Sequence, residues 1–312
     1  MGLAPFQRLP FGEVPELPRV PHPYFETPAE TVPVVSEGFG RVDVHLRIAG
    51  SGPPLLLVHD FMTTGYSWRY AIAPLAERHT VYVPDLVGSG RSGKPEASYH
   101  PDALADFVGA TMDALAIRGA AVVGNSLGGY LCMRLALRDP GAMSRLVNLH
   151  SPGLPTARMW ALRSAPAITP GWAAALRRVV QRDPERWVHR NVHYYDETLK
   201  SREEHREYAA PLATAEGFTA FARMLAETMD VRAMRRFEAD LRARSGFPIP
   251  LCLVYATRDP MVPPVVGERL HALLPGGEFL RLDEASHFAH VDATDRLLRA
   301  IHPFLQEGRS VR

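Results

Sequence analysis

The chain has 312 residues, of which 46% are hydrophobic and 22% charged, and its 35 Lys and Arg stand against 34 Asp and Glu, a formal net charge of +1. Nucleic-acid binding and membrane-surface binding both depend on a concentrated positive field, so this balance, without basic runs, argues against both kinds of partner. The apolar fraction supports a large packed core and excludes global disorder. The length predicts one large domain or a domain with a sizeable insertion.

The N-terminal stretch is dense in proline, with eight of the 28 prolines between Pro5 and Pro33. Proline fixes its own φ and disfavours helix in the preceding residue. We therefore expect residues 1–33 to form an extended arm that lies over the body of the protein or a flexible lead. The stretch has no basic region followed by an apolar one, and no apolar run of the chain could span a bilayer. A cytoplasmic protein is the resulting expectation.

From about Val34 onward, short β-rich runs alternate with helical stretches. Residues 41–49 alternate in polarity, as in a half-exposed edge strand. Short apolar runs, typical of parallel strands covered on both faces, occur at 55–59, 81–84, 120–124, 146–149 and 251–255. Helical stretches are expected at 67–78, 102–117 and 126–138. This alternation predicts an α/β fold with a mostly parallel, doubly wound sheet.

The alternation stops after Leu149 for nearly a hundred residues. Residues 152–246 favour helix, and the expected helices lie at 172–180, 197–208 and 218–229. The strand pattern resumes at 247–255. We therefore predict that 152–246 is a helical insertion in an α/β core formed by residues 34–151 and 247–312.

The strongest chemical signal is the Gly-x-Ser-x-Gly pattern at 124–128, which follows an apolar strand and precedes a helical stretch. A serine on a sharp strand-to-helix turn sits in a strained conformation, and glycines on either side let the two backbones cross closely. The helix directs its N-terminus at Ser126, and the backbone N–H of Leu127 is available to a developing oxyanion. A tight turn with an incidental serine is the weaker interpretation.

A serine nucleophile needs a base, and the base needs an orienting acid. Asp259 follows an apolar strand, and His287 and His290 follow the last strand. We expect His287 to be the base, because a packed or capping role suits His290 better. Asp283 and Glu284 precede the histidine too closely to serve as its acid.

These motifs resemble those of the α/β-hydrolases, in the group of esterases, haloalkane dehalogenases and epoxide hydrolases. The resemblance extends from roughly Val34 to Phe304 and rests on six stretches in the expected order: 55–61, 67–69, 84–92, 124–129, 259–263 and 285–287. It implies a nucleophile elbow at Ser126, an acid at Asp259 and a base at His287. It also implies oxyanion donors from the backbones of Phe61 and Leu127, and a helical cap between the two halves of the core.

The nucleophile points to a reaction class. Dehalogenases and epoxide hydrolases of this group carry Asp at the elbow, whereas Ser126 suits attack on a carbonyl and hydrolysis of an acyl-enzyme. Asn125 also occurs before the serine in the carbon–carbon hydrolases of the family, so cleavage next to a ketone stays open.

Asp60 departs from the pattern, because the family usually has glycine after His59. Aspartate tolerates a positive φ better than most residues, which offers a purely conformational explanation. A carboxylate that faced the site would oppose oxyanion formation or act as an acid. We expect the side chain to turn away from the oxyanion position.

Aromatic residues of the predicted cap are candidates to line a substrate pocket: Trp160, Trp187 and Tyr194, together with His189, His193 and Tyr195. Aromatics in a helical lid more often pack against one another, so we expect one or two of them to contact substrate.

The sequence thus predicts a serine hydrolase that cleaves a carboxylic ester of a small or medium, mainly apolar substrate, without metal or other cofactor. The alternatives are a carbon–carbon hydrolase of a vinylogous diketone and a catalytically silent hydrolase fold that acts as a ligand receptor. We expect a small-molecule substrate as the partner, no nucleic acid, no membrane, and a monomer or homodimer. Cys132 and Cys252, which lack metal-ligand or redox spacing, are expected to be buried free thiols.

Overall fold

The computed structural model describes residues 4–155 and 171–307. An eight-stranded sheet has the order β1-β2-β4-β3-β5-β6-β7-β8. The strands are β1 (Ala29–Ser36), β2 (Gly40–Ala49), β3 (Pro54–Val58), β4 (Thr80–Pro84), β5 (Ala120–Asn125), β6 (Met143–Leu149), β7 (Leu251–Ala256) and β8 (Glu278–Leu282). Strand β2 is antiparallel to β1 and to β4, and all the other pairs are parallel. The predicted, mostly parallel α/β sheet is confirmed.

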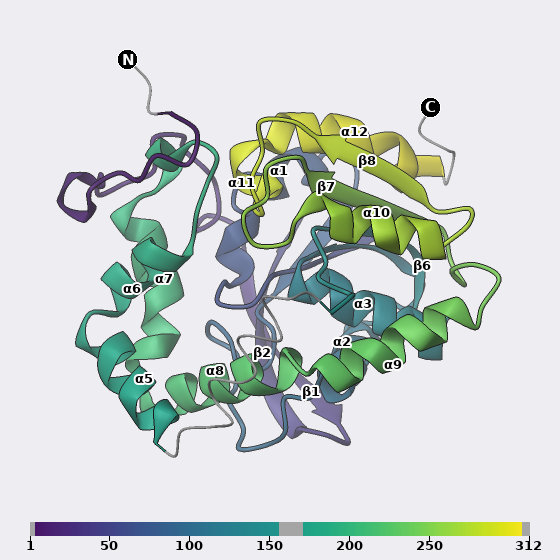
Figure 1. Cartoon of the computed structure of the whole chain (residues 1–312), viewed down its shortest axis with the longest axis horizontal. Helices are drawn as coiled ribbons and strands as arrows, with labels where there is room; N and C mark the ends of the chain where they lie inside the picture. The colour runs from purple at the N-terminus through teal and green to yellow at the C-terminus, as the bar shows by residue number, and fades with distance from the viewer. Residues whose placement is uncertain (1–3, 156–170, 308–312) are drawn as a thin grey trace.

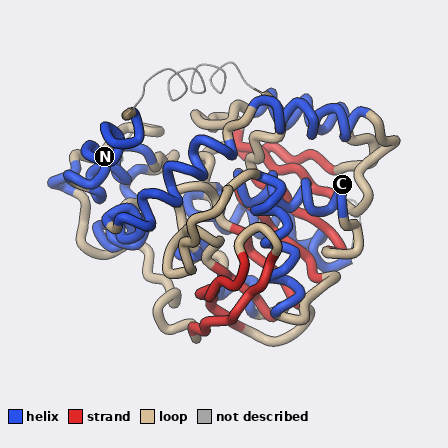
Figure 2. The backbone as a smooth tube through the Cα atoms, turned by 90° about the horizontal axis from the view of Figure 1, so that it is seen from below, coloured by secondary structure: helices blue, strands red, loops and turns tan. Residues whose placement is uncertain are grey.

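Helices cover both faces of the sheet (Figure 2). One face packs against α2 (Pro101–Ala114), α3 (Leu127–Arg138) and α10 (Pro264–Leu273). The other packs against the 3-10 helix η2 (Gly65–Trp68), α1 (Ile72–Ala76) and α12 (Thr294–Glu307), with the short α11 (Ala289–Asp292) beside them. A sheet covered on both faces explains why its central strands are apolar without alternation.

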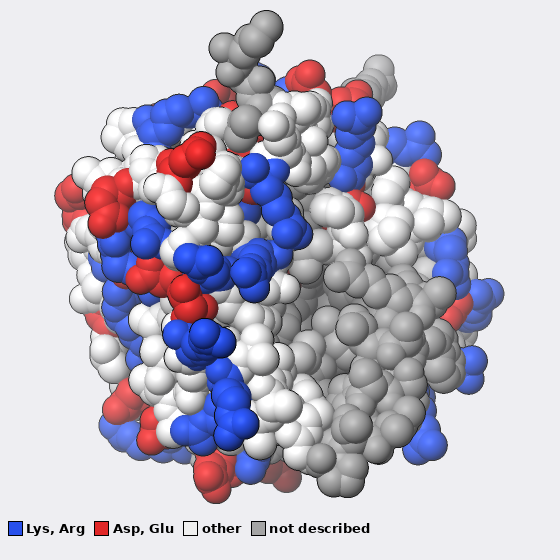
Figure 3. Space-filling model, turned by 60° about the vertical axis from the view of Figure 1, so that its left-hand side comes forward, with Lys and Arg blue, Asp and Glu red and all other residues white. Residues whose placement is uncertain are grey.

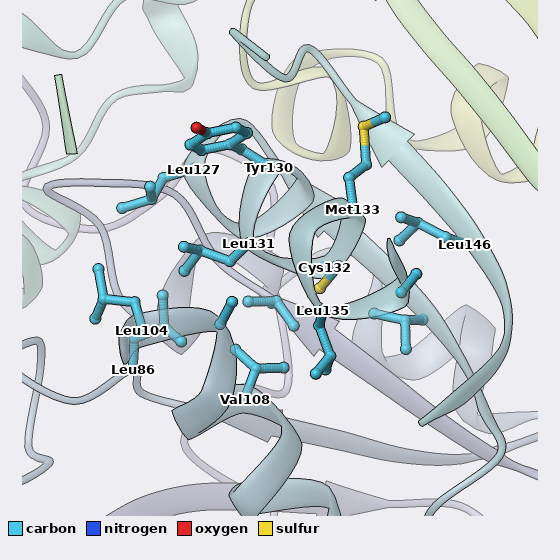
Figure 4. Close-up of a cluster of buried hydrophobic side chains, with 14 of the residues drawn as sticks. Leu86, Leu104, Val108, Leu127, Tyr130, Leu131, Cys132, Met133, Leu135 and Leu146 are labelled. Atoms are coloured by element: carbon cyan, nitrogen blue, oxygen red, sulfur yellow. The ribbon is translucent and has the colours of Figure 1, made fainter. Parts of the chain in front are cut away.

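The side chains of strand β3 alternate between the hydrophobic clusters on the two faces of the sheet. Leu56 and Val58 belong to the cluster on the α2–α3 face, and Leu55 and Leu57 belong to the cluster on the opposite face. Each of these side chains is at most 1% exposed, and burial of one such side chain stabilises a fold by about 1.5–3 kcal/mol. Figure 4 shows the first cluster around α3, where Cys132 lies among leucines. Cys132 and Cys252 are buried free thiols, as predicted.

Between β6 and β7 the described chain is helical. Its elements are α5 (Trp172–Arg182), α6 (Pro184–Asn191), η3 (Glu197–Leu199), α7 (Arg202–Ala213), α8 (Ala215–Thr228) and α9 (Val231–Arg242). In Figure 1, α5, α6 and α7 lie at the left, away from the sheet, and α8 and α9 run from there across the lower part of the molecule. These helices occupy the segment predicted as a cap.

Three differences from the predicted helices have local causes. The helix expected at 197–208 is divided, because the Ser201 hydroxyl accepts a hydrogen bond from Glu204 N (3.1 Å) and starts α7 there. Helix α6 was not predicted, although Asp183 caps it and Pro184 occupies its first turn. Helix α9 was also missed, and Asp230 caps it.

The N-terminal arm lies along the helices between β6 and β7, where Figure 1 shows it at the left of the molecule. Phe6 N donates to Tyr195 O (3.0 Å), and Arg202 N donates to Pro15 O (2.8 Å). The Phe11 ring stacks on His205, with centroids 5.8 Å apart, and the Arg202 guanidinium lies 3.9 Å from the Phe11 centroid. Strand β1 begins at Ala29, so the end of the predicted arm is already part of the sheet.

Ion pairs also join the arm to the cap, such as Arg19 with Asp196 (2.8 Å) and Arg206 with Glu16 (3.1 Å). Basic and acidic side chains lie next to one another on the face that Figure 3 turns forward. No helix in the described ranges is long and apolar enough to cross a bilayer.

Candidate active site

Ser126 lies at a sharp turn between β5 and α3, with φ 50° and ψ −111°. A residue with a side chain at this φ is strained by about 1–3 kcal/mol, so the surrounding structure must hold it there. The flanking glycines explain how. A Cβ on Gly124 would lie 2.7 Å from Gly129 backbone atoms, and a Cβ on Gly128 would lie 2.4 Å from Val58 O. Close backbone packing that only glycine permits therefore sets the geometry of the elbow.

Asp259 and His287 meet at the same edge of the sheet, after β7 and β8. His287 Nδ1 lies 2.7 Å from Asp259 Oδ2, and both side chains are almost fully buried. Asp259 Oδ1 accepts hydrogen bonds from Met261 N (2.7 Å) and Val262 N (3.0 Å). Burial disfavours the Asp259 carboxylate, but the His287 imidazole and these donors outweigh it and lower the pKa of Asp259. The acid is therefore ionised and fixed in direction.

The competing residues lie elsewhere. The His290 ring packs on Trp68, with centroids 4.2 Å apart, and neither of its nitrogens has a hydrogen-bond partner within the described chain. Burial lowers the pKa of His290 well below its ordinary value, so it stays neutral. Glu284 is exposed and pairs with Arg296 (2.8 Å). The pair that sequence order indicates, Asp259 with His287, is the pair in contact.

The prediction for Asp60 was wrong, because its carboxylate points into the site. Asp60 Oδ1 accepts hydrogen bonds from Phe61 N (2.5 Å) and Leu127 N (3.2 Å), and Asp60 Oδ2 lies 3.3 Å from His287 Nε2. The conformational explanation also fails: Asp60 is not among the residues with a positive φ, whereas Met62, two positions later, has φ 65°. Two backbone donors and the nearby His287 imidazole supply the physical reason for its direction.

Phe61 N and Leu127 N therefore converge on one point, although they belong to segments far apart in the chain. The oxygen at that point is Oδ1 of Asp60. The two backbone groups that the sequence predicts as oxyanion donors thus bind one and the same oxygen atom.

His287 lies between two carboxylates. Burial opposes its charged form, but Asp259 and Asp60 outweigh this and raise the pKa of His287 to about 10. Both carboxylates therefore favour the protonated form of the imidazole, whose Nδ1 lies 2.7 Å from Asp259 and whose Nε2 lies 3.3 Å from Asp60.

The predicted cap residues have different surroundings. Trp187 packs edge-on against Phe221 (5.4 Å), which stacks on Phe61 with centroids 5.2 Å apart and planes inclined by 10°. Tyr194 is buried, and its hydroxyl donates to Glu204 Oε2 (2.7 Å), so this polar group is engaged within the cap. Trp160 lies outside the described residues. Trp187 thus contacts Phe221, and Phe221 in turn contacts Phe61.

Tyr194 belongs to a buried polar cluster that the sequence did not reveal. Glu204 pairs with Arg69 (2.5 Å), and both side chains are fully buried. The Arg69 guanidinium lies between the rings of Tyr66 and Tyr70, 4.7 and 4.6 Å from their centroids. The Arg69–Glu204 ion pair thus connects α7 to the segment that follows η2.

Two residues near the site were not predicted to have a role there. The buried His150 ring lies 5.6 Å from the His287 ring, its φ is 54°, and burial lowers its pKa to about 4. Its position directly after β6, at the edge where Ser126 and Asp259 lie, could have indicated it. Phe221 could have been found from its apolar helical face, which it shares with Phe218. Within the described ranges, no group of three His, Cys, Asp or Glu side chains could hold a metal ion.

Residues 53–294 match the sequence profile of the alpha/beta hydrolase fold family. The chain belongs to this family. It is a hydrolase of this fold, as the motifs from Val34 to Phe304 indicated.

Three curated relatives of this chain are an uncharacterized protein and two enzymes whose names describe different reactions. An uncharacterized Mycobacterium tuberculosis protein is 29% identical over 270 residues, 83% of this chain and 77% of that protein. A 2-hydroxymuconate semialdehyde hydrolase of Pseudomonas sp. CF600 is 36% identical over 117 residues, 36% of this chain and 41% of the enzyme. A pimeloyl-[acyl-carrier protein] methyl ester esterase of Aliivibrio salmonicida is 25% identical over 272 residues, 84% and 96% of the two chains.

Among solved structures, a thermophilic esterase of Thermogutta terrifontis superposes with a TM-score of 0.69 at 22% identity, over 90% of this chain and 100% of the esterase. This likeness supports the fold.

Proposed function

We propose that this chain is a serine hydrolase that cleaves carboxylic esters through an acyl-enzyme on Ser126, without a cofactor. The observation that carries the proposal is the convergence of Phe61 N and Leu127 N on one anionic oxygen. Acyl transfer develops a negative charge on one oxygen, and a preorganised pair of backbone donors is the feature that stabilises it.

In the proposed reaction, His287 first releases its Nε2 proton to solvent, and the neutral imidazole then takes the Ser126 proton as the hydroxyl attacks the ester carbonyl. Asp259 keeps the imidazole in the correct orientation and stabilises its charged form. His287 then gives its proton to the leaving alkoxide, and the same base activates a water molecule that hydrolyses the acyl-enzyme. Asp60 must leave the Phe61 and Leu127 amides before the substrate oxygen can occupy them.

The aromatic stack supports a mainly apolar substrate. The ring of Phe61, whose backbone supplies one oxyanion donor, stacks on Phe221, and Trp187 packs edge-on against Phe221. An acyl or alkyl group next to this stack would gain apolar contact area without a polar partner. A small or medium ester fits this chemistry.

Carbon–carbon hydrolysis of a vinylogous diketone is a second candidate, and one observation favours it. Cleavage of a carbon–carbon bond leaves a carbanion equivalent that must be protonated, and His287, which lies between the carboxylates of Asp259 and Asp60 that raise its pKa, can supply that proton. The relative from Pseudomonas sp. CF600 is named for 2-hydroxymuconate semialdehyde hydrolysis, and the relative from Aliivibrio salmonicida for ester hydrolysis. The two reactions share the nucleophile and the oxyanion donors.

The test combines p-nitrophenyl acetate and butyrate turnover, a fluorophosphonate probe, and a chromogenic vinylogous diketone, with Ser126→Ala as the control. Ester hydrolysis and labelling that both disappear in the variant support the esterase. Labelling with diketone cleavage and poor ester turnover supports the second candidate. Absence of labelling in the wild-type protein contradicts both and favours a ligand receptor.

A further inference from the structure

The oxyanion donors of this site are occupied by the protein itself. Asp60 Oδ1 accepts from Phe61 N and Leu127 N at 2.5 and 3.2 Å, and Asp60 Oδ2 contacts His287 Nε2 at 3.3 Å. The carboxylate thus engages both oxyanion donors and the nitrogen that would receive the serine proton. A substrate carbonyl can react only after it displaces this carboxylate.

We propose that Asp60 makes the active site selective for the charge of its substrate. An ester with a positive charge close to its scissile carbonyl reacts faster than an uncharged ester of the same shape, and an ester with a negative charge reacts more slowly than both. The inference rests on the proposed acyl transfer at Ser126 and specifies the substrate class for that reaction.

Displacement of the Asp60 carboxylate removes its hydrogen-bond donors. Asp60 gives up hydrogen bonds to two backbone amides and its contact with His287. Its ion-pair partner His287 is already neutralised by Asp259, whose Oδ2 lies 2.7 Å from Nδ1. The displaced carboxylate is therefore a net negative charge that has lost its donors.

The displaced charge remains in a buried part of the site. Asp60 is 4% exposed, so water does not readily replace the lost donors. Its neighbour Phe61 stacks on Phe221, and Trp187 packs against Phe221, which surrounds this side of the site with aromatic rings. A buried carboxylate in such surroundings is stabilised by a positive charge on the ligand and destabilised by a negative one.

The aromatic rings add to the same preference. Rings of Phe and Trp attract a quaternary ammonium group, which loses little hydration when it is buried against them. The displaced carboxylate and the stack of Phe61 and Phe221 would thus act together on one cationic group. An anionic substrate would gain nothing from the rings and would be repelled by Asp60.

The experiment compares three thioesters of butyrate whose leaving thiols have similar shape: butyrylthiocholine, its uncharged tert-butyl isostere, and a carboxylate analogue of the same length. Release of the thiol gives kcat/KM for each, and a second set of p-nitrophenyl esters places the same charges on the acyl side. The full-length wild-type protein is compared with Asp60→Asn and Asp60→Gly. Asparagine keeps the shape and one acceptor oxygen without the charge, whereas glycine also empties the oxyanion donors.

In the wild-type protein we expect kcat/KM to be about 10- to 100-fold higher for the cationic than for the neutral member of at least one set, as a Coulomb attraction over about 6–10 Å at an effective dielectric constant of about 20 gives. The anionic member should be slower than the neutral one. In Asp60→Asn and Asp60→Gly the preference for the cationic ester should fall to the smaller part that the aromatic rings supply, about 2- to 5-fold, and the anionic and neutral esters should react at similar rates, since the Asp60 charge is gone.

Equal rates for the three charges in the wild-type protein would overturn the inference. The same charge preference in both variants would also overturn it, because Asp60 would then not be its source. Failure of the proposed function is recognised separately. In that case the fluorophosphonate does not label Ser126 in any of the three proteins, and the Ser126→Ala variant hydrolyses the thioesters as fast as its parent.

Discussion

Replacement of Asp60 by glycine should raise kcat/KM for a simple uncharged ester such as p-nitrophenyl acetate. In the parent protein, the ester carbonyl must displace a carboxylate that accepts two backbone hydrogen bonds, at 2.5 and 3.2 Å. Hydrogen bonds to a charged group contribute about 1.5–3 kcal/mol each, against about 0.5–1.5 kcal/mol for neutral groups. The variant also frees His287 Nε2, which lies 3.3 Å from the carboxylate.

The difference between two charged and two neutral hydrogen bonds is about 2–3 kcal/mol, which corresponds to an increase of about 30- to 160-fold in kcat/KM. The backbone can accept the change, because Asp60 is not at a positive φ and glycine adds only conformational freedom to the unfolded chain. We therefore expect faster turnover, with a loss of stability of up to about 3–6 kcal/mol because two backbone amides lose their acceptor.

The assay is initial-rate hydrolysis of p-nitrophenyl acetate and butyrate at a pH where the free nitrophenolate absorbs. Asp60→Asn is the matched control, since the asparagine oxygen can still occupy Phe61 N and Leu127 N. It should gain less activity than Asp60→Gly. The reasoning is refuted if kcat/KM of Asp60→Gly is equal to or below that of the wild-type protein while thermal unfolding shows that the variant is folded.

The other predictions concern pH and the N-terminal arm. His287 can act as a base only where the pH exceeds its pKa, which is raised to about 10, so kcat/KM should rise with pH up to about 10. This rise should move to lower pH in Asp60→Asn. An unchanged pH profile in the variant would contradict the contact between Asp60 and His287. Burial lowers the pKa of His150 to about 4, below the ordinary 6.5. The neutral imidazole therefore contributes fully to the stability of the fold above pH 6.5, and this contribution is lost as the pH falls toward 4. The effect on the free energy of unfolding is about 3 kcal/mol. Denaturant titration should show a smaller acid loss in His150→Asn, which tolerates φ 54°; an equal loss would assign the effect to other groups. Phe11→Ala should destabilise the protein by about 1–2 kcal/mol, because the contacts of the Phe11 ring with His205 and Arg202 are lost, and it should leave kcat unchanged. Thermal unfolding measures the first effect and ester turnover the second. A loss of kcat at unchanged stability would give the arm a role in the chemistry.

The fold and the residue pair at the site were predictable because each depends on local patterns joined in a fixed order. Apolar runs that end at a glycine, an aspartate or a loop with a histidine indicate parallel strands whose carboxyl ends meet at one edge. The elbow at Ser126 needs glycines for steric reasons that the sequence displays directly, since a Cβ on Gly128 would meet Val58 O at 2.4 Å. These features leave few alternatives for where Asp259 and His287 lie.

The direction of Asp60 was not predictable, because it depends on atoms from three distant segments. One donor is the next residue in the chain, but Leu127 N lies 67 positions away and His287 follows the last strand. A pattern of residue types records neither the rotamer nor the donors around it. The same holds for Tyr194, whose surroundings depend on Glu204 and on Arg69 far away in the sequence.

The central claim is that Ser126 carries an acyl group during turnover. Intact-protein mass spectrometry of the Asp60→Gly variant, quenched during hydrolysis of p-nitrophenyl butyrate, tests it most directly, and peptide mapping locates the added mass. The account predicts one butyryl group on Ser126 and none in the double variant that also carries Ser126→Ala. Turnover of the ester by that double variant, or a butyryl group on any other residue of the parent, would contradict it.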